Sequence, residues 1–254
     1  MPLPMRARAR LPRRLPLIVL VAALAAAGGR CSAAAQEPPG TPAADGARAS
    51  GQITVIAQER FALPNRTAGW NVTRLSAAVE EPDDPERFFA GYLLADADAV
   101  RVLPEDGDPV TVEPGQAYAI ADETELKVVS AGSTAGGLYA LTVADVAVVR
   151  EALGGPFEID RGDYDLTLFG GALEPGGSAT LQATDFPAVV LVTLGEAGFQ
   201  TGTAEPVTLT PGNGFGFSGT GTLRAGETNG LVFVAITIST PDQTPATPAV
   251  APAG

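Results

Sequence analysis

A twelve-residue stretch occurs twice in this chain, at residues 109–120 and again at residues 206–217. The first copy reads Pro-Val-Thr-Val-Glu-Pro-Gly-Gln-Ala-Tyr-Ala-Ile and the second reads Pro-Val-Thr-Leu-Thr-Pro-Gly-Asn-Gly-Phe-Gly-Phe, with five identical positions. In both copies hydrophobic residues alternate on either side of a Pro-Gly pair, which is the pattern of strand, tight turn and strand. Two copies placed 97 residues apart predict two β domains in tandem.

The likeness between the halves continues beyond this turn. Leu126 and Leu223 keep the spacing of 97 residues, and the pair Gly137-Leu138 recurs as Gly230-Leu231 with a spacing of 93. Short apolar runs separated by turn residues fill the rest, and the 254 residues include 30 Gly and 22 Pro, as in an all-β protein with many turns. One stretch, Thr142–Ala152, has instead a pattern that favours a helix.

The sequence predicts how the chain is divided. We expect a first β domain over residues 51–152 and a second over residues 153–239, each long enough to bury one core. Residues 36–50 lack an apolar period and indicate a flexible spacer. Residues 240–254 are mostly Thr, Pro and Ala and indicate a disordered tail.

The first 35 residues have the order of a secretory signal peptide. Five arginines lie within residues 1–14, the apolar run Leu15–Ala27 follows, and the small residues Ala33-Ala34-Ala35 end the segment. A retained membrane anchor is the alternative, but thirteen residues are fewer than the roughly 20 that a spanning helix needs. We therefore predict a secreted protein, located outside the cell, that meets a membrane only if this segment is not cleaved. Cys31, the single cysteine, would leave with it, so the mature chain would have no thiol chemistry.

The charge of the mature chain excludes some partners. Removing residues 1–35 takes away six of the 16 Lys and Arg residues and none of the 29 acids, which leaves a net charge of about −19. Nucleic-acid binding depends on cations that meet phosphates, so a nucleic-acid partner is not expected. Anionic membrane surfaces are disfavoured for the same reason.

The repeated turn resembles the second motif of the cupin superfamily, G-x5-P-x-G-x2-H-x3-N. Gly115 and Gly212 stand at its first glycine. The later positions hold other residues, in order Ala121, Glu123, Leu126 and Ser130 in the first half and Ser218, Thr220, Leu223 and Glu227 in the second. The first cupin motif aligns only in the second half, where its ligand positions hold Gln182, Thr184 and Ala188, before a closing Leu194-Gly195-Glu196.

The resemblance implies two tandem barrels of the cupin kind, each a double-stranded β-helix or jelly roll. It also implies a metal held inside the barrel by two or three histidines and a glutamate. This chain has no histidine, and leucine stands at both second-motif ligand positions, Leu126 and Leu223. A site of the usual nitrogen and sulfur kind cannot be built without His or Cys, so we expect no metal and no other cofactor.

The sequence therefore predicts a non-catalytic protein with a binding or structural role towards an unknown small molecule or surface component. It specifies neither the ligand nor the oligomeric state. Histidine-based catalysis is excluded. The alternatives are a cupin with a non-histidine metal site, or an enzyme that uses carboxylates alone, for example on sugars. The carboxylate candidates are Asp96, Asp98, Asp163 and Asp165. Two carboxyl groups facing each other inside one barrel would favour the enzyme, whereas barrels filled by Leu, Val and Phe would favour the non-catalytic role.

Three further features have plain structural explanations. The acidic stretches 80–86 and 105–108 offer oxygen ligands but lack the regular spacing of a calcium loop, so surface turns are favoured. The tripeptide Arg161-Gly162-Asp163 matches a short integrin-binding string, and a turn between strands explains it equally. The aromatic concentration around Trp70 and Tyr92 indicates core packing more than a ligand-stacking face.

Overall fold

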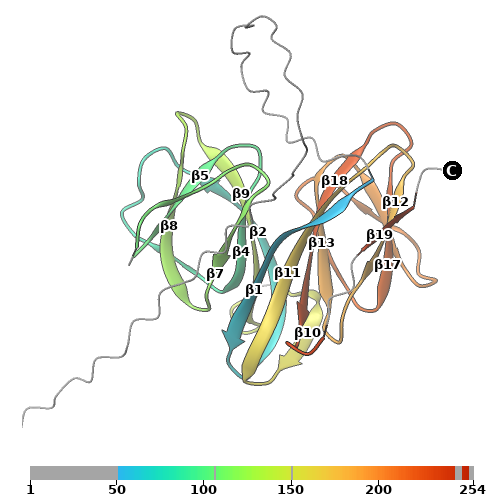
Figure 1. Ribbon diagram of the computed structural model, residues 1–254, viewed down its shortest axis with the longest axis horizontal. Helices are drawn as coiled ribbons and strands as arrows, with labels where there is room; N and C mark the ends of the chain where they lie inside the picture. Colours follow the sequence, from blue (N-terminus) through green and yellow to red (C-terminus); the bar gives the residue numbers. More distant parts are fainter. Residues whose placement is uncertain (1–50, 106, 150, 244–247, 252–254) are drawn as a thin grey trace, which may run out of the picture. The chain divides into compact units, whose positions relative to one another are not determined.

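The computed structural model describes residues 51–105, 107–149, 151–243 and 248–251, and its regular elements there are all β-strands (Figure 1). The predicted all-β fold class is therefore confirmed. The expected signal peptide and spacer, residues 1–50, lie outside the described residues. Within the described ranges, no helix is long and apolar enough to cross a membrane.

The first barrel consists of two antiparallel sheets that enclose an apolar core. We call the sheet that faces the other barrel the inner sheet and the remaining one the outer sheet. The inner sheet has the order β10 (Leu153–Ile159), β2 (Arg66–Ala77), β9 (Gly136–Asp145), β4 (Ala90–Ala95) and β7 (Ala117–Ile120). The outer sheet has the order β3 (Glu86–Phe88), β8 (Thr124–Ser130), β5 (Val100–Pro104) and β6 (Val110–Val112).

The second barrel repeats this plan. Its inner sheet has the order β1 (Ile53–Leu63), β11 (Gly162–Leu173), β18 (Leu231–Ser239), β13 (Ala188–Leu194) and β16 (Gly214–Phe217). Its outer sheet has the order β15 (Val207–Leu209), β14 (Ala197–Thr201), β17 (Thr220–Ala225), β12 (Ser178–Gln182) and β19 (Ala249–Ala251). Apart from β19, each strand has a counterpart in the first barrel, and the two tandem jelly rolls follow from this strand order.

The two barrels exchange one strand each. β1 comes before every strand of the first barrel in sequence, yet it pairs with β11 of the second barrel. β10 follows the first barrel's other strands and pairs with β2. Residues 53–63 precede the predicted division at residue 152 but complete the inner sheet of the second barrel. Residues 153–159 follow that division but complete the inner sheet of the first barrel.

A third apolar core lies between the two inner sheets. Trp70 and Tyr92 are fully buried there, as the core-packing interpretation predicted. The indole Nε1 of Trp70 donates to the carbonyl oxygen of Pro187 at 2.6 Å, and the hydroxyl of Tyr92 donates to that of Leu166 at 2.6 Å. Both donors belong to the first barrel and both acceptors to the second, so hydrogen bonds join the barrels across this core.

The repeated Pro-Gly turn takes the same conformation in both barrels, as predicted. Gly115 has φ 75° and Gly212 has φ 86°, a left-handed conformation that favours glycine. Gly115 N–H donates to the carbonyl of Ala95 and Gly212 N–H to that of Val192, each at 2.9 Å. The equivalence of the two turns confirms the duplication.

The sequence spacing of the last strands needs a correction. Ala95 pairs with Leu138 and Val192 pairs with Phe233, so β9 and β18 correspond at a spacing of 95 residues. The match of Gly137-Leu138 with Gly230-Leu231, at a spacing of 93, is therefore a likeness in sequence but not in register. Backbone pairing fixes the equivalent positions, whereas Gly-Leu pairs recur readily in a Gly-rich chain.

The burial predicted for the repeated turn is correct at its inner positions and wrong at its first ones. Val112 and Leu209 are both 3% exposed, whereas Val110 and Val207 are 40% and 41% exposed. Each exposed valine begins a three-residue strand at the edge of an outer sheet, where the rim of the barrel leaves it uncovered. Ile120 and Phe217 are buried as expected, while Tyr118 and Phe215 are half-buried.

The predicted helix over Thr142–Ala152 is wrong. Residues up to Asp145 extend β9, and a turn follows. β9 is the middle strand of its sheet, with one face towards the barrel core and the other towards the core between the barrels. Burial on both faces removes the alternation that marks a strand, so the apolar run resembles part of a helix.

Part of the tail predicted to be disordered forms a strand. Residues 249–251 make β19, which pairs antiparallel with β12. Val250 is half-buried and packs against the core of the second barrel. The Pro and Thr content of this segment concealed a short edge strand of small residues.

Candidate functional site

The barrel interiors, where the cupin resemblance would place a ligand, are filled with apolar side chains. Leu126 is 1% exposed and packs in the first core, and Leu223 is 0% exposed and packs in the second, as the leucine substitution predicted. Gly115 and Gly212 form the turns that precede these positions and carry no side chain. The residues present at the second-motif positions therefore do not fit a metal ion.

The first-motif positions of the second half supply no ligand set either. Gln182 is exposed, and Ala188 is fully buried in the core of the second barrel. Thr184 is half-buried and donates its hydroxyl to the carbonyl of Ile238. Among the residues that the structure describes, no three His, Cys, Asp or Glu side chains lie close enough together to hold a metal.

The structure does not bring the four candidate catalytic carboxylates together. Asp96 accepts a hydrogen bond from Arg74 at 3.3 Å, and Asp98 is exposed in the turn after β4. Asp165 accepts from Arg60 at 2.8 Å, and Asp163 is exposed at the start of β11. None of them belongs to either barrel core.

The ion pair of Arg74 and Asp96 lies beside a buried phenol. The guanidinium of Arg74 is 5.8 Å from the centre of the Tyr139 ring. Burial raises the pKa of Tyr139, the charge of Asp96 raises it further, and Arg74 lowers it. Tyr139 belongs to the core between the barrels, so this ion pair lies beside that core and not inside a barrel.

The acidic stretches lie in surface turns. The described part of residues 80–86 is exposed except for Pro82, which is half-exposed, and Glu81 accepts an ion pair from Lys127 at 3.1 Å. The stretch 105–108 connects β5 and β6, and its described members are exposed. The surface-turn interpretation fits both.

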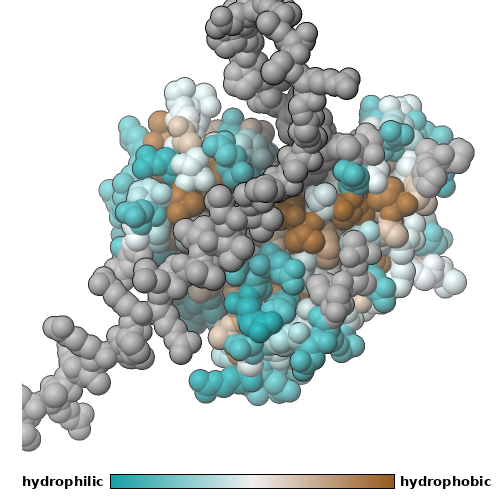
Figure 2. Space-filling view, viewed as in Figure 1, coloured by the Kyte–Doolittle hydropathy of each residue, from teal (hydrophilic) through white to brown (hydrophobic). Residues whose placement is uncertain are grey.

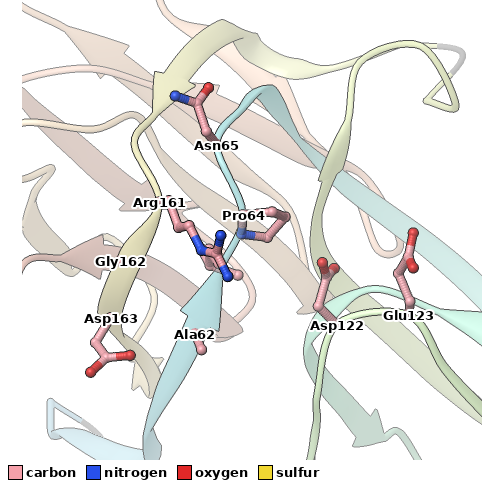
Figure 3. A pocket seen from close by; sticks show the side chains of 9 residues that line it. Ala62, Pro64, Asn65, Asp122, Glu123, Arg161, Gly162 and Asp163 are labelled. Carbon is pink, nitrogen blue, oxygen red and sulfur yellow. The ribbon is translucent and has the colours of Figure 1, made fainter.

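A hollow of about 770 Å³ lies outside the barrels, where three turns meet (Figure 3). Its lining comes from the end of β1, the β1–β2 turn, the β7–β8 turn and the β10–β11 connection. The residues are Ala62, Leu63, Pro64, Asn65, Asp122, Glu123, Arg161, Gly162 and Asp163. Because β1 and β10 are the exchanged strands, the exchange brings these turns together.

Asp122 is fixed in the wall of this hollow by a nearly buried arginine. Arg66 Nη1 donates to both Asp122 oxygens, at 3.1 and 3.0 Å, and Nη2 donates to Oδ1 at 3.1 Å. Nη2 also donates to the carbonyl of Val143 at 2.8 Å. The Arg66 side chain is only 7% exposed, and its Nε is buried without a hydrogen-bond partner. The orientation of the Asp122 carboxylate is therefore strongly determined.

Glu123, next in the same turn, has an unusual backbone. Its φ of 56° is the one positive value of a non-glycine residue within the described ranges. Its Oε1 forms an ion pair with Arg87 Nη2 at 2.8 Å. A non-glycine residue in this conformation costs of the order of 1 kcal/mol, which the surrounding turn must offset.

Arg161 and Asp163 form the opposite side of the hollow. Figure 3 shows the Arg161 side chain extending towards Pro64, while the carboxylate of Asp163 points away. Sequence reasoning singled out the tripeptide Arg161–Asp163 but did not connect it with Asp122 and Glu123. No local pattern could have done so, because about 40 residues separate the two segments.

Hydrophobic surface is exposed elsewhere on the molecule. Figure 2 shows it over β1 and the neighbouring strands of the second inner sheet, and Val55 of β1 is 53% exposed. A second hollow, of about 510 Å³, is lined by apolar residues that include Leu173, Leu194 and Leu231. Leu194 is 63% exposed. Exposed apolar side chains of this number are ordinary on a soluble surface and define no ligand by themselves.

No family model matches this chain, and no curated protein matches it. Similar solved structures include vicilin from hazelnut (Corylus avellana), with 12% identity, coverage of 66% of this chain and 74% of that chain, and a TM-score of 0.49. Procruciferin, the 11S globulin of Brassica napus, has 9% identity, coverage of 76% and 87%, and a TM-score of 0.48. Oxalate decarboxylase from Bacillus subtilis has 9% identity, coverage of 77% and 78%, and a TM-score of 0.47.

These structural neighbours are cupin-family proteins. The strand order of the chain itself defines the class of fold, which is two tandem cupin-like barrels. A fold of this class does not by itself specify a function, because one fold can carry many different sites. Function must therefore be argued from the site.

Proposed function

We propose that this chain is an exported, non-catalytic two-barrel protein with a binding or structural role. The observation that carries the proposal is the filling of both barrels. The first core contains Phe88, Leu93 and Leu126, and the second contains Phe199, Leu223 and Phe233, all of them buried. Side chains packed in this way leave no polar cavity at the place where the cupin pattern would hold a reacting group.

The arrangement of the carboxylates supports the same proposal. A glycoside hydrolase needs two carboxyl groups on either side of one bond, about 5–10 Å apart. Here Asp96 and Asp165 are engaged with Arg74 and Arg60 on strands of different barrels. No observation therefore favours the enzyme that acts on sugars with carboxylates alone.

Export is supported by the sequence of residues 1–35. The mature chain would carry its two barrels on a spacer that begins at Gln36. N-terminal sequencing of protein purified from its native host should begin at or near Gln36. A chain that starts at a lipid-modified Cys31 would contradict secretion in free form.

Elemental analysis of the natively purified protein tests the non-catalytic role. We expect no stoichiometric Fe, Mn, Zn, Cu or Ni, because leucines occupy the ligand positions. A chelator should leave the melting temperature unchanged, since no metal would contribute to folding. Stoichiometric metal would mean that carboxylates replace the histidines of the cupin pattern, and the non-catalytic proposal would then be wrong.

A further inference from the structure

Arg161 lies on one side of the hollow, and within the described part of the chain no carboxylate forms an ion pair with it. Six of the Lys and Arg side chains form ion pairs, namely Arg60, Arg66, Arg74, Arg87, Lys127 and Arg224. Among the described residues only Arg101 and Arg161 do not. Of these two, Arg161 is the one that lines the hollow, and its side chain is exposed. The guanidinium group of Arg161 can therefore bind an anionic group through two parallel N–H donors.

The opposite side of the hollow keeps free acceptor capacity. Oδ1 of Asp122 accepts from both terminal nitrogens of Arg66 and, at 3.4 Å, from the N–H of Ala90, whereas Oδ2 accepts from one nitrogen only. The ion pair of Glu123 uses Oε1. Each carboxylate oxygen has about two lone-pair sites, so Asp122 Oδ2 and Glu123 Oε2 can still accept from a ligand.

The two charged sides are separated by an apolar floor. Figure 3 shows Arg161 on one side, Asp122 and Glu123 on the other, and Pro64 between them; Ala62 and Leu63 also line the hollow. No ion pair joins Arg161 to either carboxylate. A ligand with a single charge would meet one side favourably and the other unfavourably. A ligand with charges of both signs would satisfy both sides, and an apolar side chain on it would contact the floor.

One of the two carboxylates, that of Asp122, is held in place before any ligand arrives. Arg66 fixes Asp122 from within the protein, whereas the side chain of Glu123 is 59% exposed and pairs with Arg87. Because Asp122 needs little reordering, binding energy is not spent on immobilising it. A strained residue beside a hollow also gives a physical reason to look for function there.

We propose that this hollow binds a small zwitterion, whose carboxylate pairs with Arg161 and whose ammonium group lies at Asp122 and Glu123. The ligand class is that of free amino acids with an apolar side chain. The site lies outside both barrels. The proposal rests on the binding role proposed above and gives that role a ligand class.

The test is a titration of the mature chain, residues 36–254, followed by NMR, with three ligands of one carbon skeleton. L-Leucine carries both charges, 4-methylpentanoate lacks the ammonium group, and 3-methylbutylamine lacks the carboxylate. We expect saturable shifts at Glu123 and Gly162 with leucine, and an affinity at least about tenfold higher than for either singly charged ligand, which corresponds to about 1.4 kcal/mol. Equal affinities for the three ligands, or no saturable shift with leucine, would overturn the proposal.

Paired variants locate the binding. Arg161→Gln and Glu123→Gln should each weaken leucine binding by about tenfold or more. Arg101→Gln removes the same charge from β5, where the other arginine without a carboxylate partner lies, and should leave the affinity unchanged. Unchanged binding in Arg161→Gln would refute the assignment. Failure of these tests leaves the metal analysis untouched, whereas stoichiometric metal would contradict the non-catalytic role whether or not leucine binds.

Discussion

The two barrels meet along two junctions that differ in the size of the residues between them. At one junction β10 of the first barrel lies against β16 of the second, and at the other β1 lies against β7. β16 carries Gly214 and Gly216 where β7 carries Ala117 and Ala119, at the common spacing of 97. An added Cβ at Gly216 would lie 2.0 Å from the backbone nitrogen of Gly154. The glycines of β16 therefore allow the backbones of β10 and β16 to approach closely. The junction of β1 and β7 has room for the side chains of two alanines.

The two barrel interiors, in contrast to the two junctions, bury equivalent positions to the same degree. Equivalent positions such as Ile120 and Phe217 are both buried, at 1% and 4% exposure, although their side chains differ in size. Leu126 and Leu223 are the same residue in the same environment. The duplicated fold thus keeps an apolar residue at each inward position, while the junctions are adjusted by small residues where two edges approach.

The largest effect is expected for the interior leucines. Leu126→Ala and Leu223→Ala should each lower the free energy of unfolding by about 2–5 kcal/mol, because each leaves a cavity in a close-packed core. Denaturant unfolding of both variants measures this. Leu194→Ala, at a 63% exposed position, is the control and should cost about 0.5 kcal/mol or less. A large cost in one barrel and none in the other would break the equivalence of the interiors.

The glycine junction should be the next most sensitive. Gly216→Ala places a methyl group against the backbone of β10, and we expect a loss of about 3 kcal/mol in the free energy of unfolding. The reciprocal change, Ala119→Gly at the other junction, should cost only about 0.5–1 kcal/mol through backbone entropy. Thermal or denaturant unfolding of the pair measures the difference. Equal losses at the two positions would show that the junctions do not differ in the way described.

The hydrogen bonds between the barrels allow a test by pH. Burial raises the pKa of Tyr92 above its ordinary value of about 10. The unfolded chain therefore loses this proton first, so the stability is complete below about pH 10 and falls as the pH rises towards the folded pKa. Tyr92→Phe should cost about 1 kcal/mol at neutral pH and make the fall above pH 10 shallower.

Trp70 supplies the matched comparison, because its indole joins the barrels in the same way but does not titrate. Trp70→Phe should destabilise the protein at all pH values and leave the alkaline fall as in the wild type. Unfolding curves between pH 7 and about 11 decide the matter. An unchanged alkaline fall in Tyr92→Phe would mean that Tyr92 does not control it.

The outer sheets offer the smallest expected effect on stability. β3 is an open edge that carries Glu86 and Arg87, whereas the uncharged edge β12 is covered by β19. Deleting residues 244–254 should change the free energy of unfolding by about 0.5 kcal/mol or less. It should nevertheless cause self-association at high concentration, because an uncharged open edge can pair with another copy.

Light scattering of the truncated chain at increasing protein concentration measures this self-association. Adding Thr180→Lys to the truncated chain should restore the state of the full chain, since a charge on the edge blocks pairing. If the truncated chain behaves as the full chain does at every concentration, β19 does not protect the edge.

Much of the fold could be predicted from local patterns. The alternation around Gly115 and Gly212 predicted strand, turn and strand in each half, and the leucine positions Leu126 and Leu223 were correctly expected to be buried. Prediction failed where the burial of a strand depends on which other strands and sheets pack against it. The run Thr142–Ala152 lost its strand period because β9 is covered on both faces. Val110 and Val207 kept the period but stand at a rim that nothing covers.

The candidate site could not be predicted from the sequence, because it too depends on contacts between distant segments. Arg161 and Glu123 face one hollow because β1 and β10 cross to the opposite barrels, which no local pattern specifies. A two-residue period and a Pro-Gly turn act within a few residues, so the sequence by itself determined the strands, the duplication and the absence of histidine. Which sheet a strand joins depends on packing with residues about 100 positions away, so only the tertiary structure decided the exchange, the junctions and the hollow.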